Sequence, residues 1–333
     1  MHETQIINWG IIGAGDVAEI KSGPAFYRAP GSRLLAVMRR DANKARDFAQ
    51  RHQVPLWYND AEALLANPDI DAVYIATPPA FHKDYAIAAM RANKDVYLEK
   101  PVTCNAQECA AIIATRDETS RKICAAHYRR QLPAFMKVAE LLEDQAIGTP
   151  LLARIDMLQP LRSSLIAQTD ENWRLNPALS GGGLFHDLSP HQLDLMLNWF
   201  GPVTAAQGFA VNQSQLSAAD DCVIGWARFA SGVEFHGRWH FAAPANSVRD
   251  ECEIIGSEGR LTINFFGQPV VSLYRGDEQQ EFHLPNPPHI QQPMIEIVNA
   301  YFRDERDNPC TMEEAKAVME LIDTFTLRDK NNN

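Results

Sequence analysis

The sequence predicts two domains of different fold class, an α/β domain over residues 1–126 and an α+β domain over residues 127–333. The first observation is that short apolar runs alternate with helical patterns up to residue 126, which is typical of a parallel sheet. The second is that the later runs alternate apolar and polar residues and are joined by short turns, as antiparallel strands are. The third is the length of 333 residues, which suits about two domains.

Five strands are expected in the first domain, with helices between them. Apolar runs predict strands at residues 6–12, 33–38, 72–76, 96–98 and 122–126. Apolar residues at helical spacing predict helices at 41–52, 81–92 and 105–115, and Asp41 is placed to cap the first of them. Strands and helices in repeated alternation predict a parallel sheet with helices on both faces.

The second domain reads as antiparallel sheet with an inserted helix. Strands are expected at 151–157, 222–230, 233–242, 251–255 and 260–265, and Ser231-Gly232 and residues 256–259 are typical hairpin turns. A helix is expected near 187–200, with Pro190 in its first turn, where proline is tolerated. Thr311 and Glu314 form a capping box that begins a final helix.

Composition excludes several classes of protein. The net charge of −11 gives no basic footprint for a nucleic-acid partner. The apolar runs are far shorter than the roughly 18 residues that a membrane helix needs, and the first ten residues lack the pattern of a signal peptide. We therefore expect a cytoplasmic protein whose six cysteines are reduced. No metal site is expected, because His236 and His240 lie on one strand, about 13 Å apart.

The first strand ends in a Gly-x-Gly-x-x-Ala pattern, Gly13-Ala14-Gly15-Asp16-Val17-Ala18. Gly13 permits the tight turn, Gly15 lets the backbone approach a pyrophosphate, and Ala18 allows close packing of helix on strand. The following helix offers its N-terminal N–H groups to phosphates. The context of strand, turn and helix predicts a Rossmann dinucleotide-binding domain in which Gly13, Gly15, Asp16 and Val17 contact the cofactor.

The end of the second strand bears on the choice between NADP and NAD. An acidic residue there would bind the ribose 2′-hydroxyl of NAD, but the sequence has Arg39 and Arg40, whose guanidinium groups suit the 2′-phosphate of NADP. We therefore expect NADP, with Arg39 and Arg40 at the cofactor. NAD is the alternative, with Asp41 turned toward the ribose and both arginines in solvent.

Two further segments suggest chemistry. Glu99-Lys100-Pro101 follows the fourth strand, at the sheet edge where α/β proteins bind ligands, so that Lys100 could hydrogen-bond a substrate oxygen. Asp187 and His191 lie four residues apart and share a helix face after a run of three glycines, an arrangement that suits His191 as a general acid or base. Taken alone, the first segment is better read as a surface lysine in a loop before a proline turn. The second, taken alone, is better read as a helix-capping aspartate with a packed helix histidine.

The order and spacing of these motifs resemble the Gfo/Idh/MocA oxidoreductase family over nearly the whole chain. The matching segments are GIIGAGDVA at 10–18, ATPP with His82 at 76–82, NKDVYLEKP at 93–101, Tyr128-Arg129-Arg130, Trp173-Arg174 and GGGLFHDLSPH at 181–191. Asn93 stands where the family usually has glycine. Ser189-Pro190 and His186 also depart from its pattern, and His186 could reach the substrate.

The resemblance implies a Rossmann domain followed by an α+β domain with a large, mainly antiparallel open sheet. It implies hydride transfer between NAD(P)(H) and a carbinol or carbonyl carbon of a sugar, polyol or related small molecule. Lys100 would contact the reacting oxygen, His191 would be the acid/base, and Asp187 would tune His191. Residues lining the cofactor or substrate would be Thr77, Pro78, His82, Glu99, Arg129, Trp173 and Arg174. The exposed sheet face would form a homodimer or homotetramer.

We therefore expect an NADP-dependent sugar or polyol oxidoreductase. One alternative is a non-catalytic NADP-binding sensor of the same fold, and another is an enzyme that retains its cofactor and recycles it through paired substrates. Loops at 159–169 and 285–292 are candidates for substrate recognition, and they are equally consistent with ordinary surface loops. The sequence does not name the substrate.

Overall fold

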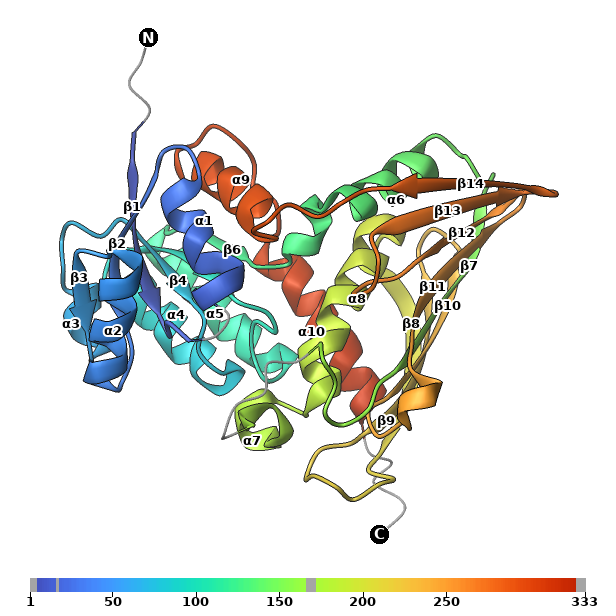
Figure 1. Ribbon diagram of the computed structural model, residues 1–333, viewed down its shortest axis with the longest axis horizontal. Helices are drawn as coiled ribbons and strands as arrows, with labels where there is room; N and C mark the ends of the chain where they lie inside the picture. The colour runs from blue at the N-terminus through green and yellow to red at the C-terminus, as the bar shows by residue number, and fades with distance from the viewer. Residues whose placement is uncertain (1–4, 16–17, 166–171, 328–333) are drawn as a thin grey trace. The chain divides into compact units, whose positions relative to one another are not determined.

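The computed structural model describes residues 5–15, 18–165 and 172–327, and these divide into two compact units. Of the described residues, the first unit comprises those up to Tyr128 together with Pro287–Lys316, and the second comprises those from Arg129 to Asn286 and from Ala317 onward. Figure 1 shows a sheet flanked by helices in the first unit and a broad sheet in the second. The predicted fold class, α/β followed by α+β with a mainly antiparallel sheet, is confirmed.

The first unit is built on a six-stranded parallel sheet in the order β3-β2-β1-β4-β5-β6. Its strands are β1 Ile7–Ile12, β2 Ser32–Met38, β3 Leu56–Tyr58, β4 Ala72–Ile75, β5 Asp95–Leu98 and β6 Ile123–Ala125. The strand order reverses beside β1, and ligands of open α/β sheets bind at such a point. Strand β3 was not predicted from the sequence, because an edge strand of three residues is too short to show a period.

Helices cover the two faces of this sheet (Figure 1). They are α1 Gly23–Arg28 (preceded by a π-helical turn, Ala18–Ser22), α2 Ala42–His52, α3 Ala61–Leu65, α4 His82–Arg91, α5 Ala106–Thr119 and α9 Gln292–Phe302. On one face, Trp9 of β1 packs against Phe26 of α1 and Phe302 of α9, with ring centroids 4.8 and 5.5 Å apart. Gly10 faces Leu64 and Ile70 on the other side. A segment from late in the chain thus completes the core of the first unit.

The second unit holds an eight-stranded sheet in the order β14-β13-β12-β11-β7-β10-β9-β8. The strands are β7 Pro150–Leu158, β8 Val203–Val211, β9 Cys222–Phe229, β10 Glu234–His240, β11 Arg249–Gly256, β12 Arg260–Ile263, β13 Val270–Arg275 and β14 Glu278–His283. All pairs are antiparallel except β7 with β10. Both predicted hairpins, β9–β10 and β11–β12, are confirmed.

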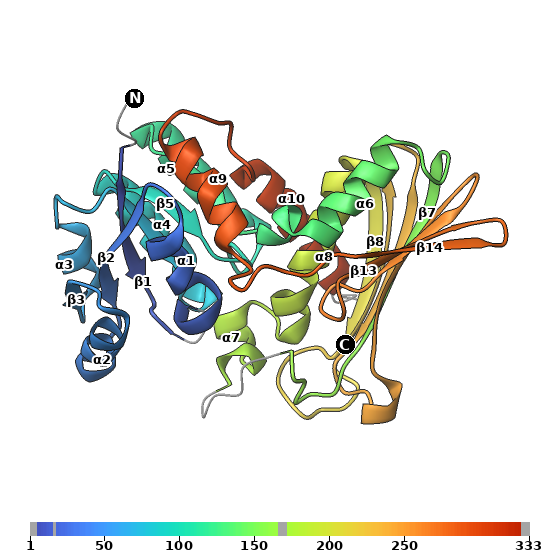
Figure 2. The same ribbon diagram turned by 45° about the horizontal axis from the view of Figure 1, so that its top comes forward.

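Helices α6 Pro133–Glu143, α8 Leu184–Phe200 and α10 Met312–Thr326 lie on one face of this sheet, while a short α7, Pro177–Ser180, precedes α8 (Figures 1 and 2). Helix α10 packs closely on β8 and β9, because a Cβ at Gly208 or Gly225 would lie within 2.5 Å of Phe325. The alternate side chains on these strands face the other way, and Phe209, Ile224 and Trp226 are exposed there. The capping box of α10 is confirmed, with Glu314 and Thr311 bonded reciprocally.

Candidate active site

The glycine turn after β1 is joined to the end of β2 by hydrogen bonds. The N–H groups of Gly13 and Ala14 both donate to the Met38 carbonyl, at 3.1 Å. Gly13 has a φ of +93°, and a Cβ there would lie 2.8 Å from both the backbone nitrogen and the Cγ2 of Thr77. Gly13 is therefore required by its own backbone and by the turn after β4, as the sequence predicts.

Gly15 has a different reason to be glycine. Among the described residues, a Cβ at this position would meet only the Gly13 carbonyl oxygen, at 3.9 Å, so these residues leave the space beside Gly15 open. Nearby, Thr77 Oγ1 is buried without a hydrogen-bond partner among the described residues. An open glycine backbone and an unsatisfied hydroxyl beside the same turn fit the approach of a phosphate group. The predicted contacts of Asp16 and Val17 lie outside the described residues.

Arg39 and Arg40 follow β2, and Arg39 comes directly after the strand residue whose carbonyl holds the glycine turn. Arg39 is half-buried, while Arg40 is exposed with its guanidinium 5.5 Å from the ring centroid of Phe81. Asp41 is the N-cap of α2, and its carboxylate accepts from the N–H groups of Asn43 and Lys44, at 2.9 and 3.2 Å. The acidic group that could bind an NAD ribose is thus engaged by the helix.

His82 links the turn after β4 to the loop after β5. Its Nε2 lies 2.7 Å from the Thr77 carbonyl oxygen, and its Nδ1 lies 2.9 Å from the Pro101 carbonyl oxygen. Burial lowers the pKa of His82 to about 4, and the positive charge of Lys100 also lowers it, although the hydrogen bonds to the two carbonyls act to raise it. Neutral His82 donates a hydrogen bond to one of these two carbonyls, and its buried ring lies between the loops of Thr77-Pro78 and Lys100-Pro101. The Lys100-Pro101 bond is cis.

Glu99 lies beneath Lys100 with both carboxylate oxygens bonded. Its Oε1 accepts from the Tyr74 hydroxyl at 2.5 Å and from Gln291 Nε2 at 2.6 Å, and its Oε2 accepts from the Lys100 N–H at 2.9 Å. Burial raises the pKa of Tyr74 well above its usual value, and the Glu99 carboxylate raises it further. Glu99 is therefore part of the support for Lys100.

The second unit carries its candidate residues on α8 and just before it. Helix α8 begins at Leu184, earlier than predicted, so Pro190 lies inside the helix. The expectation that Pro190 falls in the first turn is therefore wrong. Gly183 is the N-cap, with a φ of +82°, and a Cβ there would lie 2.3 Å from the Cβ of Ala219. The glycine run thus ends in a backbone turn that begins the helix before Asp187.

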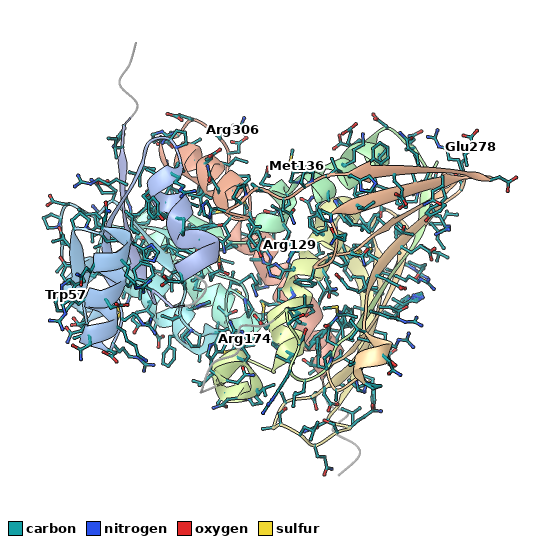
Figure 3. All side chains as sticks on the ribbon, in the orientation of Figure 1. Trp57, Arg129, Met136, Arg174, Glu278 and Arg306 are labelled. Atoms are coloured by element: carbon teal, nitrogen blue, oxygen red, sulfur yellow. The ribbon has the colours of Figure 1, made fainter. Side chains whose placement is uncertain are left out.

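Trp173, Arg174 and Asp187 form one cluster. Arg174 Nε donates to Asp187 Oδ2 at 3.1 Å, and the Arg174 guanidinium carbon lies 4.5 Å from the Trp173 ring centroid (Figure 3 labels Arg174). Arg174 is 7% exposed, and its buried Nη1 has no hydrogen-bond partner among the described residues. The side chain of Asp187 is thus fixed by a buried arginine that sequence reasoning placed at the cofactor.

Arg129 and His191 both contact Phe266. The guanidinium carbon of Arg129, labelled in Figure 3, lies 4.3 Å from the Phe266 ring centroid, and its Nη1 donates to the Phe265 carbonyl at 2.5 Å. The ring centroids of His191 and Phe266 are 5.8 Å apart. Asp250 accepts from the N–H groups of residues 265–267 and so holds this loop. The loop fixes one side of the His191 ring.

His186 is buried against the glycine run, since a Cβ on Gly182 would lie 2.1 Å from its ring. Burial lowers the pKa of His186 to about 4. Its Nδ1 has no hydrogen-bond partner in the described part of the chain.

The structure brings the predicted residues together in two groups. Gly13, Thr77, Pro78, His82, Glu99, Lys100 and Arg39 belong to the first unit, and Arg129, Trp173, Arg174, Asp187 and His191 belong to the second. Sequence reasoning missed the roles of Tyr74, Gln291, Asp250 and Phe266. Gln291 is in the 285–292 loop that the sequence offered for substrate recognition, but it is buried against Glu99. No pattern near these residues in the sequence indicates their partners.

No helix within the described residues is long and apolar enough to cross a membrane. The same residues contain no group of three or more His, Cys, Asp or Glu side chains that could hold a metal ion.

Comparison with known protein families and sequences gives consistent matches. Residues 7–127 match a family model described as an oxidoreductase family with an NAD-binding Rossmann fold, and residues 135–262 match the GFO/IDH/MocA C-terminal domain. An oxidoreductase of Formosa agariphila is 44% identical over 96% of this chain and 98% of its own length. A 1,5-anhydro-D-fructose reductase of Ensifer adhaerens is 28% identical over 84% of this chain and 83% of its own.

Solved structures share the fold across nearly the whole chain. A 3-ketoreductase from Actinomadura kijaniata, in complex with NADP and TDP-benzene, has a TM-score of 0.82 at 22% identity and covers 96% of both chains. A levoglucosan dehydrogenase in complex with NADH and levoglucosan has a TM-score of 0.82 at 21% identity, again over 96% of both.

Proposed function

The chain belongs to the Gfo/Idh/MocA family of NAD(P)-dependent oxidoreductases, which act on CH–OH groups, and we propose that it uses NADP(H) on a sugar or polyol. The reacting centre is a carbinol carbon in one direction and a carbonyl carbon in the other. Relatives named as a 1,5-anhydro-D-fructose reductase and a levoglucosan dehydrogenase support this substrate class.

The preference for NADP rests on the side chains after β2. Asp41 uses its carboxylate to cap α2, whereas the half-buried Arg39 follows the strand that holds the glycine turn. A guanidinium group offers charge and paired donors to a 2′-phosphate. This is the observation that carries the cofactor proposal, because the solved relatives include one with NADP and one with NADH.

The bound nicotinamide would supply the chemistry of hydride transfer to or from the substrate carbon. We assign His191 the role of general acid/base: it accepts the proton of the substrate hydroxyl during oxidation and donates a proton to the carbonyl oxygen during reduction. Lys100 donates a hydrogen bond to the same oxygen and stabilises negative charge that develops on it. Asp187, held by Arg174 and one helical turn before His191, sets the orientation and basicity of the imidazole.

A titration with NADPH and NADH, followed by tryptophan fluorescence, tests the cofactor proposal. NADPH should bind more tightly than NADH. Arg39→Ala should weaken NADPH binding by about 10- to 100-fold, as expected when a hydrogen bond between charged groups is lost, and leave NADH binding nearly unchanged. Arg46→Ala is the matched control, since Arg46 is exposed on α2 and bonded to Asn43. Tighter binding of NADH by the wild type would reject the proposal.

The proposal includes a homodimer or homotetramer formed through the exposed sheet face. On this face Phe209 of β8 is in register with Ile224 of β9, and Trp226 lies two residues along. An apolar face of this kind is stabilised when a second copy covers it. Light scattering should show an oligomer for the wild type and a smaller species for Trp226→Glu, while a monomeric wild type would contradict this part.

The proposal also places the enzyme in the cytoplasm, a reducing compartment in which its six cysteines remain thiols. Fractionation of cells that express the tagged protein would test the location.

A further inference from the structure

The carboxylate of Glu99 is a buried acceptor with three donors. Glu99 is 6% exposed, and its partners Tyr74 and Gln291 are 0% and 1% exposed. Tyr74 and Gln291 donate to one carboxylate oxygen, and the backbone of Lys100 donates to the other. An ionised carboxylate only accepts hydrogen bonds, and in a buried site each of them is expensive to lose. The position of the Lys100 backbone is therefore tied to how firmly Glu99 is held.

Gln291 reaches Glu99 from far along the chain. The two residues are 192 apart in sequence, and Gln291 immediately precedes α9. Two contacts fix α9 to the first unit. Trp9 Nε1 donates to Asn299 Oδ1 at 3.0 Å in the core, and Lys122 Nζ donates to the carbonyls of Tyr301 and Phe302 at 3.0 and 2.8 Å. The amide of Gln291 thus comes from the residue before a helix that is held by contacts separate from the Glu99 loop.

Tyr74 and Gln291 have different supports. Tyr74 is part of β4, next to β5, and its ring stacks on Tyr97 at 5.5 Å between centroids. Gln291 is carried by a segment that lies outside the first 128 residues of the chain. The carboxylate of Glu99 is therefore held from the sheet on one side and from the α9 segment on the other.

We propose that Gln291 is a positioning residue for Lys100, acting through Glu99. The hydrogen bond from the Gln291 amide fixes the Glu99 carboxylate, and this carboxylate in turn holds the Lys100 N–H. The backbone of Lys100 is thereby positioned so that its ammonium group points toward the reacting oxygen. This inference rests on the proposed function for the role of Lys100, although the geometry of the chain from Gln291 to Lys100 stands without it.

Amide hydrogen exchange tests the linkage directly. Gln291→Leu should accelerate exchange of the Lys100 N–H by about tenfold or more, as expected when a buried hydrogen bond to a charged group is lost. The Glu99 N–H, which donates to the Ile75 carbonyl within the sheet, is the internal reference and should keep its protection. Gln107→Leu is the control, since Gln107 is exposed on α5 of the same unit.

Tyr74→Phe provides a second variant that keeps the ring and removes the hydroxyl, which donates to Glu99 Oε1 and is also bonded to Ser22. It should also accelerate exchange of the Lys100 N–H, and protection of the amides in α9 should be retained. If exchange at Lys100 in both variants equals that of Gln107→Leu, the proposal is overturned, whatever the enzyme's activity.

Kinetics separate positioning from a general structural role. With a sugar or polyol that the wild type turns over, Gln291→Leu should lower kcat about tenfold and leave the Kd for NADPH within about twofold, because only the reacting oxygen loses a contact. Equal loss of kcat and of NADPH affinity would overturn the positioning role. If the wild type turns over no sugar or polyol, the proposed function fails, and the exchange result still decides the linkage from Gln291 to Lys100.

Discussion

Gly15→Ala is expected to separate cofactor binding from stability. Of the residues that the structure describes, the Cβ of alanine at this position would meet only the Gly13 carbonyl oxygen, at 3.9 Å, which is an ordinary contact. The φ of Gly15 lies outside the left-handed region, so alanine fits the backbone without strain. By contrast, Gly13→Ala places a Cβ 2.8 Å from Thr77 in a backbone with φ of +93°.

These geometries give opposite expectations for the two variants. Gly15→Ala should leave the free energy of unfolding unchanged or raise it by about 0.4–1 kcal/mol, because alanine restricts the unfolded chain. Gly13→Ala should lower it by roughly 2–5 kcal/mol, from the left-handed conformation and the overlap with Thr77. If a pyrophosphate approaches the backbone of Gly15, the added methyl group should weaken NADPH binding by about 100-fold, or about 2.7 kcal/mol.

Urea denaturation and NADPH titration of the two variants beside the wild type form the assay. The expected pattern is a stable Gly15→Ala protein that binds NADPH poorly and a destabilised Gly13→Ala protein. Wild-type affinity for NADPH in Gly15→Ala would refute the reasoning, because the space beside Gly15 would then not hold the cofactor. A large loss of stability in Gly15→Ala would refute its geometric basis.

Three further predictions concern single side chains. Asp194→Ala should lower the free energy of unfolding, measured by urea denaturation, by about 3–5 kcal/mol, because Arg130, bonded to Asp194 at 2.7 and 2.9 Å, stays buried. Arg238→Ala, which breaks the exposed ion pair with Asp156, should cost less than about 1 kcal/mol. Equal costs in the two variants would contradict this expectation. The pKa of His186 is lowered to about 4 in the folded protein, so the unfolded chain binds a proton at this histidine first, as the pH falls below about 6.5, and the free energy of unfolding decreases in that range. Between pH 7.5 and 5, His186→Phe should therefore lose about 2 kcal/mol less of its free energy of unfolding than the wild type loses. Identical pH dependence of the two proteins would reject the lowered pKa. Asp41→Ala should lower the free energy of unfolding by about 1 kcal/mol, because the N-cap of α2 is lost, and should leave the ratio of NADPH to NADH affinity unchanged. A selective loss of NADH affinity would show instead that Asp41 binds the ribose.

Local patterns predicted most of the first unit, because strands such as β1 and β4 are continuous apolar runs and α2 begins at a capping aspartate. Gly13 could be assigned from sequence, since its place in the Gly-x-Gly-x-x-Ala pattern marks a tight turn, and the structure gives it a left-handed φ. The capping box at Thr311 was equally clear. Each of these features is marked by residues only a few positions apart in the sequence.

Features that depend on distant segments could not be predicted. Gln291 is bonded to a carboxylate 192 residues away, and no periodicity or spacing connects the two. Phe266 meets His191 from a loop whose backbone N–H groups are bonded to the distant Asp250. The start of α8 was misplaced because Asp187 is a good capping residue by type, whereas the helix begins after Gly183, whose positive φ is not visible in the sequence.

Turnover by the wild type and by His191→Ala and Lys100→Ala tests the central claim most directly. The absorbance of the reduced nicotinamide would be followed with NADP⁺ and a panel of sugars and polyols, and in reverse with NADPH and keto-sugars. The account predicts turnover by the wild type and a loss of about 100-fold or more in kcat in each variant, as expected for a lost acid/base or oxygen contact, with NADPH affinity within about twofold. Full activity in both variants would contradict the assignment of these residues to the reaction.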